Sequence, residues 1–315
     1  MVMWIDKYAP KSLEEFVGNN LLAKKVFTIC DENNSPHIIM SGPSGIGKTT
    51  LINMVIKNQI HTPEEMHNLL LRFDSTDDRS IQSIREKICQ FVPRKVNNGL
   101  QKIVLFEQAD KLGDGVQQLM RGLMEKYTHN TIFIFVCDFI YGMNDAIQSR
   151  CMVYQFTSLS EEELIYQQKK ILNSENIENT DPEILRTIAI ISNGDLRQCI
   201  NYLQTSYGAC MPNKMNIETI KKVCLFPHFT KIQELFREMD AKNISNVLKI
   251  IIAFHTDGYS SSDIIMFINS HIQLYSICNE KKHLNIMKEI SLGYNRVQSV
   301  DSSIQLCGIL VRIMK

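Results

Sequence analysis

Positions 42–50 hold a run of small residues that ends in a lysine and two threonines, Gly-Pro-Ser-Gly-Ile-Gly-Lys-Thr-Thr. The run directly follows the apolar segment 37–41, and we expect it to open a helix. A strand, a glycine-rich turn and a helix start in this order direct several backbone N–H groups at one point, where a phosphate group fits. Lys48 would supply a cation to the β- and γ-phosphates, and Thr49 a hydroxyl group to Mg²⁺. This segment predicts that the chain binds a nucleoside triphosphate.

An acidic residue follows the apolar run 102–106, at the position where nucleotide hydrolases support Mg²⁺. That residue is Glu107, one methylene longer than the usual Asp. The next residue, Gln108, stands where a glutamate normally polarises the attacking water. An amide cannot accept a proton, although it could orient a water molecule. The pair therefore suits metal support better than water activation.

Three further polar residues are candidates for the same site. Asp138 ends the apolar run 131–137, a position that often carries an Asn near the γ-phosphate. Its carboxylate would repel a triphosphate unless it is protonated or turned toward a basic partner, and a solvent-facing role is equally open. Arg150 closes a helical turn, and Arg197 lies near the start of a helix, from which it could reach phosphates across a cleft. Both arginines are also compatible with ordinary surface positions.

Residues 72–102 carry seven lysines and arginines against four acidic residues. Arg79 and Arg85 lie six positions apart near a helix start, so they could contact successive phosphates of a nucleic-acid backbone. A solvated charged face is the more ordinary interpretation of such a run.

The composition is that of a globular protein of two or three domains, with 315 residues, 44% hydrophobic residues and a formal net charge of +0. Any DNA binding must therefore come from a local basic stripe, because no global field attracts nucleic acid. The nine cysteines form no CxxC pair or metal-binding cluster, which indicates reduced thiols. No apolar window approaches 18 residues, and Asp6 and Lys7 interrupt the N-terminus. We expect a soluble, intracellular protein without a membrane partner.

Short apolar runs alternate with helical patterns in the first half of the chain. The expected strands are 37–41, 69–73, 102–106, 131–137 and 152–156, which are the buried runs of a parallel sheet covered on both faces. After Leu159 only helical patterns follow, at about 160–175, 181–192, 195–208 and 216–224, with about five more segments from 228 to 315. We predict an α/β nucleotide domain over 1–158, a small helical domain over 159–226 and a helical bundle over 227–315.

Taken together, these segments resemble the small subunits of replication factor C, the AAA+ clamp loader. Trp4-Ile5-Asp6-Lys7-Tyr8-Ala9-Pro10 is similar to the family's N-terminal W-[VI]-[ED]-K-Y-x-P box. The resemblance continues through 77–85, the helix at 117–125, the I-Q-S-R-C signature at 147–151 and the G-D-L-R sensor-2 motif at 194–197. It spans the whole chain and is strongest in the first 200 residues or so.

The resemblance implies an AAA+ RecA-like domain, a helical lid and a C-terminal collar that forms a hetero-pentamer with other replication factor C subunits. It implies that the ring loads a PCNA-like sliding clamp onto primer–template DNA. Arg150 would be the arginine finger for a neighbouring subunit's ATP, and Arg79 and Arg85 would contact DNA. Mg²⁺ would be supported by Thr49 and Glu107. The residues implied to bind ATP are Tyr8, Pro10, Gly42, Pro43, Ser44, Gly45, Ile46, Gly47, Lys48, Thr49, Thr50 and Arg197. Such a protein would be nuclear in a eukaryotic cell, or at a cytoplasmic replication site if viral.

The chain departs from the family pattern where hydrolysis is carried out. The family's D-E-A-D box is replaced by Glu107-Gln108-Ala109-Asp110, and its sensor-1 Asn by Asp138. A usual basic DNA contact is replaced by Gly142. A lost water-polarising glutamate costs roughly 10²–10⁴-fold in rate. The alternatives are therefore a non-hydrolysing structural subunit of the same ring and, from the phosphate-binding loop alone, a stand-alone kinase.

Overall fold

The computed structural model of the chain describes residues 2–31, 35–60, 62–74, 80–93, 101–177, 181–210, 229–274, 280–299 and 302–314. The chain divides into two compact units, Met1–Met215 and Asn216–Lys315. The boundaries predicted at 158 and 226 stay predictions. The expected helix at 216–224 lies outside the described residues.

A five-stranded parallel sheet forms the centre of the first unit, in the order β2-β3-β4-β1-β5. Its strands are β1 (His37–Ser41), β2 (Leu70–Phe73), β3 (Lys102–Phe106), β4 (Thr131–Cys137) and β5 (Cys151–Gln155). Every residue of β1, β3 and β4 is buried, as expected for the central strands of a sheet that is covered on both faces. The predicted parallel sheet is confirmed, with strand ends that differ by one residue at β2 and β5.

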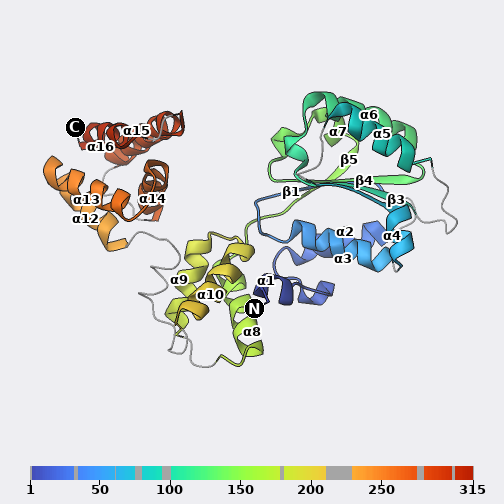
Figure 1. Cartoon of the computed structure of the whole chain (residues 1–315), viewed down its shortest axis with the longest axis horizontal. Helices are drawn as coiled ribbons and strands as arrows, with labels where there is room; N and C mark the ends of the chain where they lie inside the picture. The colour runs from blue at the N-terminus through green and yellow to red at the C-terminus, as the bar shows by residue number, and fades with distance from the viewer. Residues whose placement is uncertain are drawn as a thin grey trace. The chain divides into compact units, whose positions relative to one another are not determined.

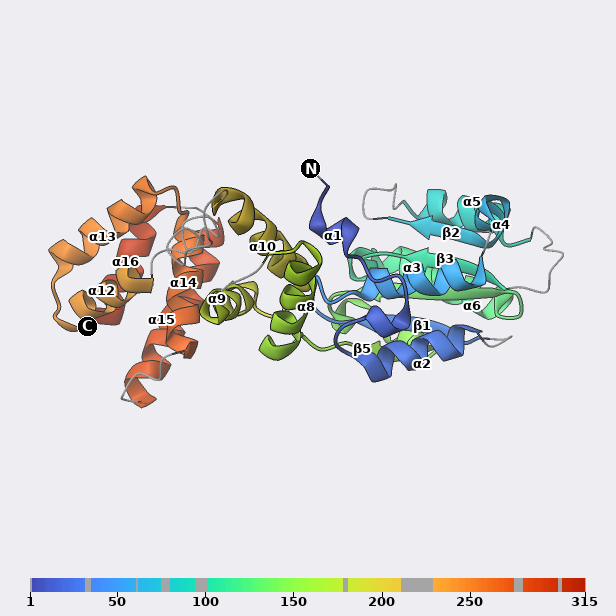
Figure 2. The same cartoon turned by 90° about the horizontal axis from the view of Figure 1, so that it is seen from below.

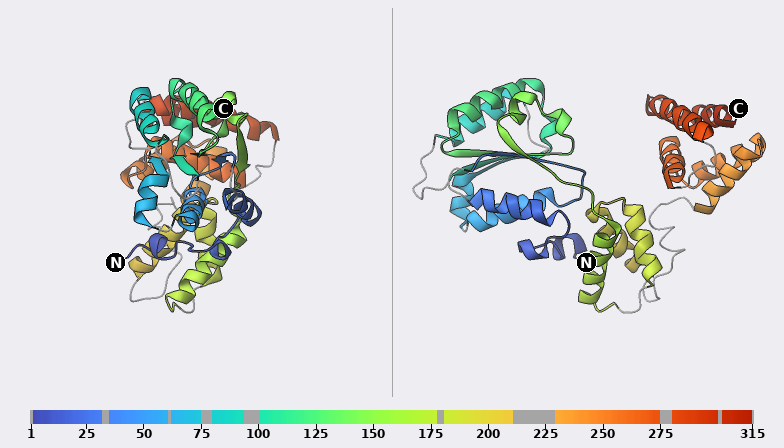
Figure 3. Two further views of the ribbon diagram at one scale, coloured as in Figure 1. Left: turned by 90° about the vertical axis from the view of Figure 1, so that its right-hand side faces the viewer. Right: turned by 180° about the vertical axis from the view of Figure 1, so that it is seen from behind.

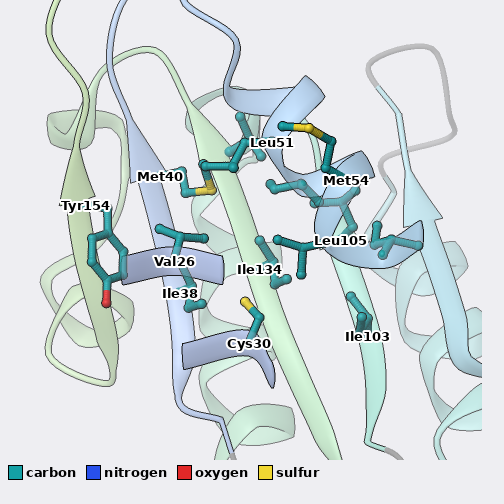
Figure 4. Close-up of a cluster of buried hydrophobic side chains, with 14 of the residues drawn as sticks. Val26, Cys30, Ile38, Met40, Leu51, Met54, Ile103, Leu105, Ile134 and Tyr154 are labelled. Carbon is teal, nitrogen blue, oxygen red and sulfur yellow. The ribbon is translucent and has the colours of Figure 1, made fainter. Parts of the chain in front are cut away.

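Helices cover both faces of this sheet (Figure 1). One face carries α2 (Asn20–Asp31), α3 (Lys48–Gln59) and α4 (Pro63–Leu69), and the other α5 (Ile81–Phe91), α6 (Asp114–Tyr127) and α7 (Asp145–Gln148). Figure 4 shows the core on the α2–α3 side, to which Val26, Leu51 and Leu105 belong. Short 3-10 turns at Leu13–Glu15, Ala109–Lys111 and Ile140–Gly142 connect these elements. The carboxyl ends of the parallel strands therefore lie at one edge, with the start of α3 among them.

In the described part of the first unit, three helices follow the sheet: α8 (Glu161–Ser174), α9 (Pro182–Ser192) and α10 (Leu196–Cys210). Ser160 and Glu163 form a reciprocal capping box at the start of α8, which satisfies two backbone N–H groups and explains the predicted start. The short helix α1 (Trp4–Lys7) packs on α10 (Figure 2), where the Trp4 amide donates to the Gln204 side-chain oxygen at 2.9 Å. The N-terminus is thus fixed to the helices that follow the sheet.

The second unit is helical, with α12 (Phe229–Asp240), α13 (Ile244–Thr256), α14 (Ser261–Leu274), α15 (Glu280–Ser299) and α16 (Ser303–Met314) (Figure 3). They enclose a core of their own, rich in isoleucine. The expected helical segments are thus confirmed within the described residues. In that part of the chain every cysteine is a free thiol, and no helix is both long and apolar enough to cross a bilayer.

The buried imidazole of His37 lies at the start of β1, with only 5% of the residue exposed. Its Nδ1 accepts a hydrogen bond from the Phe133 amide at 3.2 Å, so the proton of the neutral ring sits on Nε2. Burial lowers the pKa of His37 below its ordinary value of 6.5, because the charged form loses its hydration. The folded chain therefore holds this histidine neutral.

We expect the first unit to lose stability as the pH falls below about 6.5. In this range His37 binds a proton in the unfolded chain, whereas it stays neutral in the folded chain because its pKa is lower there. The slope from this residue is at most about 1.4 kcal/mol per pH unit and ends at the lower folded-state pKa. Denaturant unfolding followed by the fluorescence of the single tryptophan, Trp4, measures it. His37→Asn keeps an acceptor without titrating and should remove the slope. His67→Asn, at an exposed position, should keep it. Equal slopes in the wild type and His37→Asn contradict this account.

Candidate nucleotide-binding site

A cavity of about 880 Å³ lies at the carboxyl edge of the sheet. Its walls come from the N-terminal segment, the start of α3, the ends of β3 and β4, and α8 and α10. Most of the predicted site residues line it: Tyr8, Pro10, Ser44, Gly45, Ile46, Gly47, Lys48, Thr49, Thr50, Glu107, Gln108, Asp138 and Arg197. The fold thus gathers residues that are far apart in the chain, from the N-terminal box to the start of α10.

The loop between β1 and α3 has the backbone shape that its glycines were expected to allow. Gly45 and Gly47 have φ angles of +68° and +95°, which disfavour any residue with a Cβ. A Cβ on Gly45 would lie 1.8 Å from Asp195 Oδ1, and one on Gly42 would lie 2.5 Å from the carbonyl oxygen of Phe156. The glycines therefore permit a tight turn that leads directly into the start of α3, and backbone N–H groups at such a helix start bind phosphate.

Lys48 is the first residue of α3, and only 7% of it is exposed. Its ammonium group donates to the carbonyl of Gly42, to that of Pro43 at 2.8 Å and to Asp138 Oδ1 at 2.9 Å. A cation held over the loop in this way fits the polyanion of a nucleoside triphosphate. Asp138, which sequence reasoning left between a solvent-facing and a site position, lines the cavity and pairs with the loop lysine. Burial raises the pKa of the neighbouring Cys137 thiol to about 12, so the thiol stays protonated.

The two residues after β3 differ in their contacts. Glu107 forms an ion pair with Arg72 of β2, and its backbone amide donates to the Phe73 carbonyl at 3.0 Å. Gln108 adopts a left-handed conformation with φ +49°, and its side-chain oxygen accepts from Lys111 Nζ at 2.9 Å. A carboxylate suited to Mg²⁺ is therefore present, but it already has a cationic neighbour.

The start of α10 contacts the phosphate-binding loop directly. Asp195 caps the helix by accepting from the Gln198 amide at 3.0 Å, and it also accepts from Ser44 Oγ at 3.2 Å. The Leu196 amide donates to the Gly45 carbonyl at 3.2 Å. The exposed Arg197 follows in the first turn of α10 and lines the cavity. Sequence reasoning chose Arg197 and missed Asp195, whose cap position next to a glycine was the available signal.

Tyr8 and Pro10 line the cavity on the N-terminal side. The Tyr8 hydroxyl donates to Glu175 Oε1 at 2.8 Å, and Lys7 Nζ lies 2.7 Å from the same oxygen. The hydrogen bond from Lys7, with that from Tyr8, holds the pKa of Glu175 below its ordinary value. The N-terminal box is thereby linked to Glu175, the cap residue directly after α8.

Arg150 lies outside the cavity of its own chain. Its guanidinium forms an ion pair with Glu125 of α6 and donates to the Ala146 carbonyl at 2.8 Å. The hydrogen bond from Arg150 holds the pKa of Glu125 below its usual range. Arg85 is exposed on α5 and is not among the cavity residues, and Arg79 lies outside the described residues. Arg85 and Arg150 therefore both lie outside the chain's own nucleotide site.

Two protein-family models match parts of this chain. The family model described as "ATPase family associated with various cellular activities (AAA)" matches residues 38–159, and the one described as "RCF1/5-like, AAA+ ATPase lid domain" matches 169–207. Replication factor C subunit 2 of Arabidopsis thaliana is 30% identical over 98% of this chain and 92% of its own length. The chain belongs to the replication factor C small-subunit family. Replication factor C subunit 4 of Saccharomyces cerevisiae and the replication factor C small subunit of Staphylothermus marinus are also 30% identical, over 99% of this chain and 95% and 94% of their own lengths.

Solved structures of Thermotoga maritima RuvB share the fold at lower similarity. The RuvB Holliday junction branch migration motor aligns with a TM-score of 0.55 at 16% identity, covering 75% of this chain and 80% of that chain. A point mutant of RuvB aligns with a TM-score of 0.56 at 14% identity, covering 75% of this chain and 81% of its own. At these identities the match shows the AAA+ fold and no more. Membership in the replication factor C family leaves the stand-alone kinase without support.

We expect Asp138→Asn to tighten ATP binding by about fivefold, which is close to 1 kcal/mol. The carboxylate neutralises Lys48 and would face the triphosphate, and 39% of its side chain is exposed, so solvent screens part of its charge. Equilibrium titration with a fluorescent ATP analogue measures the change. Asp145→Asn, at an exposed position outside the cavity, should leave the affinity unchanged. Weaker binding by Asp138→Asn would show that the carboxylate supports the nucleotide instead of opposing it.

Proposed function

We propose that this chain is an ATP-binding subunit of a multi-subunit clamp loader that places a PCNA-like sliding clamp on primer–template DNA in replication or repair. The observation that carries the proposal is the cavity in which the loop lysine, the sheet-edge acids and Arg197 come together within a replication factor C chain. Its partners would be other replication factor C subunits in a hetero-pentamer. In a eukaryotic cell it would act in the nucleus.

Within the cavity, the proposed site residues would have distinct tasks toward ATP. The loop amides and Lys48 would hold the β- and γ-phosphates, Thr49 would offer its hydroxyl to the accompanying Mg²⁺, and Arg197 would reach the phosphates from α10. Tyr8 and Pro10 would border the base. The loop and the start of α10 already contact each other through Ser44 and Asp195, so a phosphate held by the loop would lie close to Arg197.

Hydrolysis by this subunit is expected to be slow. Gln108 cannot remove a proton from water, and its oxygen is engaged by Lys111 at 2.9 Å. This observation favours a second candidate, a ring subunit whose nucleotide serves assembly alone.

The remaining proposed residues act on other molecules. Arg150 would reach the ATP of a neighbouring subunit, in line with its place outside its own cavity. Arg79 and Arg85 would contact DNA phosphates without reading sequence. We propose residues 1–158 as the ATP-binding domain, 159–226 as the lid and 227–315 as the collar.

The test of this function is ATP affinity and single-turnover hydrolysis, measured for the wild type and for Gln108→Glu. We expect tight binding by both proteins and slow hydrolysis by the wild type. Gln108→Glu should hydrolyse at least about tenfold faster, since it restores an acceptor for the water proton. Gln101→Glu, outside the cavity, serves as the matched control. Fast wild-type hydrolysis, with no gain from the glutamate, would contradict the assigned role of Gln108, and absence of ATP binding would overturn the proposed function.

Arg150→Ala should leave this chain's own ATP affinity nearly unchanged and slow hydrolysis in a neighbouring subunit of the reconstituted ring by roughly 10³-fold. Titration of mutant subunit into the ring, with turnover as the readout, measures the effect. Glu125→Gln removes the charge that holds Arg150 and should leave the neighbour's hydrolysis at or above the wild-type rate. A defect confined to this chain's own site would rule out a role in trans.

A further inference from the structure

Arg72 is a cation that lies beside the residue assigned to the metal. Its guanidinium forms an ion pair with Glu107, donates to Asp74 Oδ1 at 3.0 Å, and donates to Asn53 Oδ1 at 3.3 Å. Glu107 and Asn53 line the nucleotide cavity. All three nitrogen atoms of the guanidinium are thus engaged at the wall of the site.

The sheet register places Arg72 there. Arg72 of β2 pairs with Leu105 of β3, and residues paired across parallel strands project to the same face. Glu107 lies two positions beyond Leu105, so it projects to that face as well. Leu105 belongs to the core on the side of the sheet that α3 covers. From that side, Asn53 of α3 accepts the hydrogen bond from Arg72. The contact is therefore fixed by three secondary-structure elements.

The ion pair changes what Glu107 offers to a metal. A carboxylate that supports Mg²⁺ accepts hydrogen bonds from the water shell that this ion keeps in protein sites. Here a guanidinium occupies that carboxylate with a charge-assisted hydrogen bond and neutralises it. Arg72 and Glu107 are about one-third and one-fifth exposed, so the pair is partly shielded from solvent. A hydrated dication would have to displace a resident cation to gain the same carboxylate.

We propose that Arg72 serves as the built-in counter-ion of Glu107, so that ATP binding by this chain gains little from Mg²⁺. This inference rests on the ATP binding proposed above and specifies its metal dependence. Mg²⁺ that arrives with the nucleotide meets Thr49 and a carboxylate whose charge Arg72 already neutralises. The phosphates are held by the loop and by Lys48, which do not need the metal.

The experiment measures ATP affinity of the full chain in excess Mg²⁺ and in EDTA. For the wild type we expect the two dissociation constants to agree within about threefold. Arg72→Gln removes the counter-ion of Glu107, and the affinity of this variant should fall by about tenfold or more when Mg²⁺ is removed. The double variant Arg72→Gln/Glu107→Gln should lose this new dependence, because the unneutralised carboxylate is its cause.

Two controls separate charge from folding. Arg72→Lys retains a cation and should keep a small Mg²⁺ effect, and circular dichroism of each variant reports its fold. Arg186→Gln, at a side chain that is 69% exposed on α9, should match the wild type. A wild-type affinity that drops tenfold or more in EDTA would overturn the inference, and so would an equal Mg²⁺ effect in the wild type and in Arg72→Gln. Absence of ATP binding in both conditions would instead reject the proposed function.

Discussion

Burial of the Lys48 ammonium is the constraint on which the site depends. A buried cation is tolerated only when acceptors surround it, and here they are the carbonyls of Gly42 and Pro43 and the carboxylate of Asp138. The carbonyls require the tight glycine turn after β1. The carboxylate requires β4 to lie beside β1 and to end at the same edge, which parallel pairing ensures. The loop, the sheet order and the start of α3 are therefore one structure that holds a single positive charge.

Two acidic residues that line the cavity at the sheet edge are each paired with a basic side chain. Asp138 faces Lys48, and Glu107 faces Arg72. In both pairs the carboxylate belongs to the edge where a nucleotide hydrolase manages its metal and water. Because each of these carboxylates is paired with a basic side chain, the cavity repels a polyanion less. The same pairing leaves less carboxylate charge to bind a metal ion or to activate water. The backbone at Gln108 adopts a left-handed conformation. The side chain at this position is an amide, which cannot accept a proton from water.

Much of this could be predicted from the sequence, because the signals were local. Apolar runs such as 131–137 specify buried strands, and the spacing within 42–50 specifies the loop and the helix that it opens. For Asp138 the sequence left protonation, a basic partner and a solvent-facing position open, and the fold places it beside Lys48. Arg72 could not be found in this way, since its contact with Glu107 depends on β2 being the neighbour of β3. The Arg150–Glu125 pair likewise joins the turn between α7 and β5 to α6 through the fold, which no local pattern contains.

The contact between Ser44 and Asp195 indicates how the two sides of the cavity are coupled. Asp195 is shared between the loop and the first turn of α10, so a change in the loop acts directly on the helix that carries Arg197. No hydrolysis is needed for this coupling, because it uses hydrogen bonds at the rim of the phosphate site and the cap of a helix. If the chain holds ATP without rapid turnover, as proposed, the nucleotide would still be able to position α10 and the N-terminal helix that packs on it. Under the proposed function, Gln108 in place of a water-activating glutamate would be compatible with a nucleotide that organises the subunit while hydrolysis takes place in neighbouring subunits.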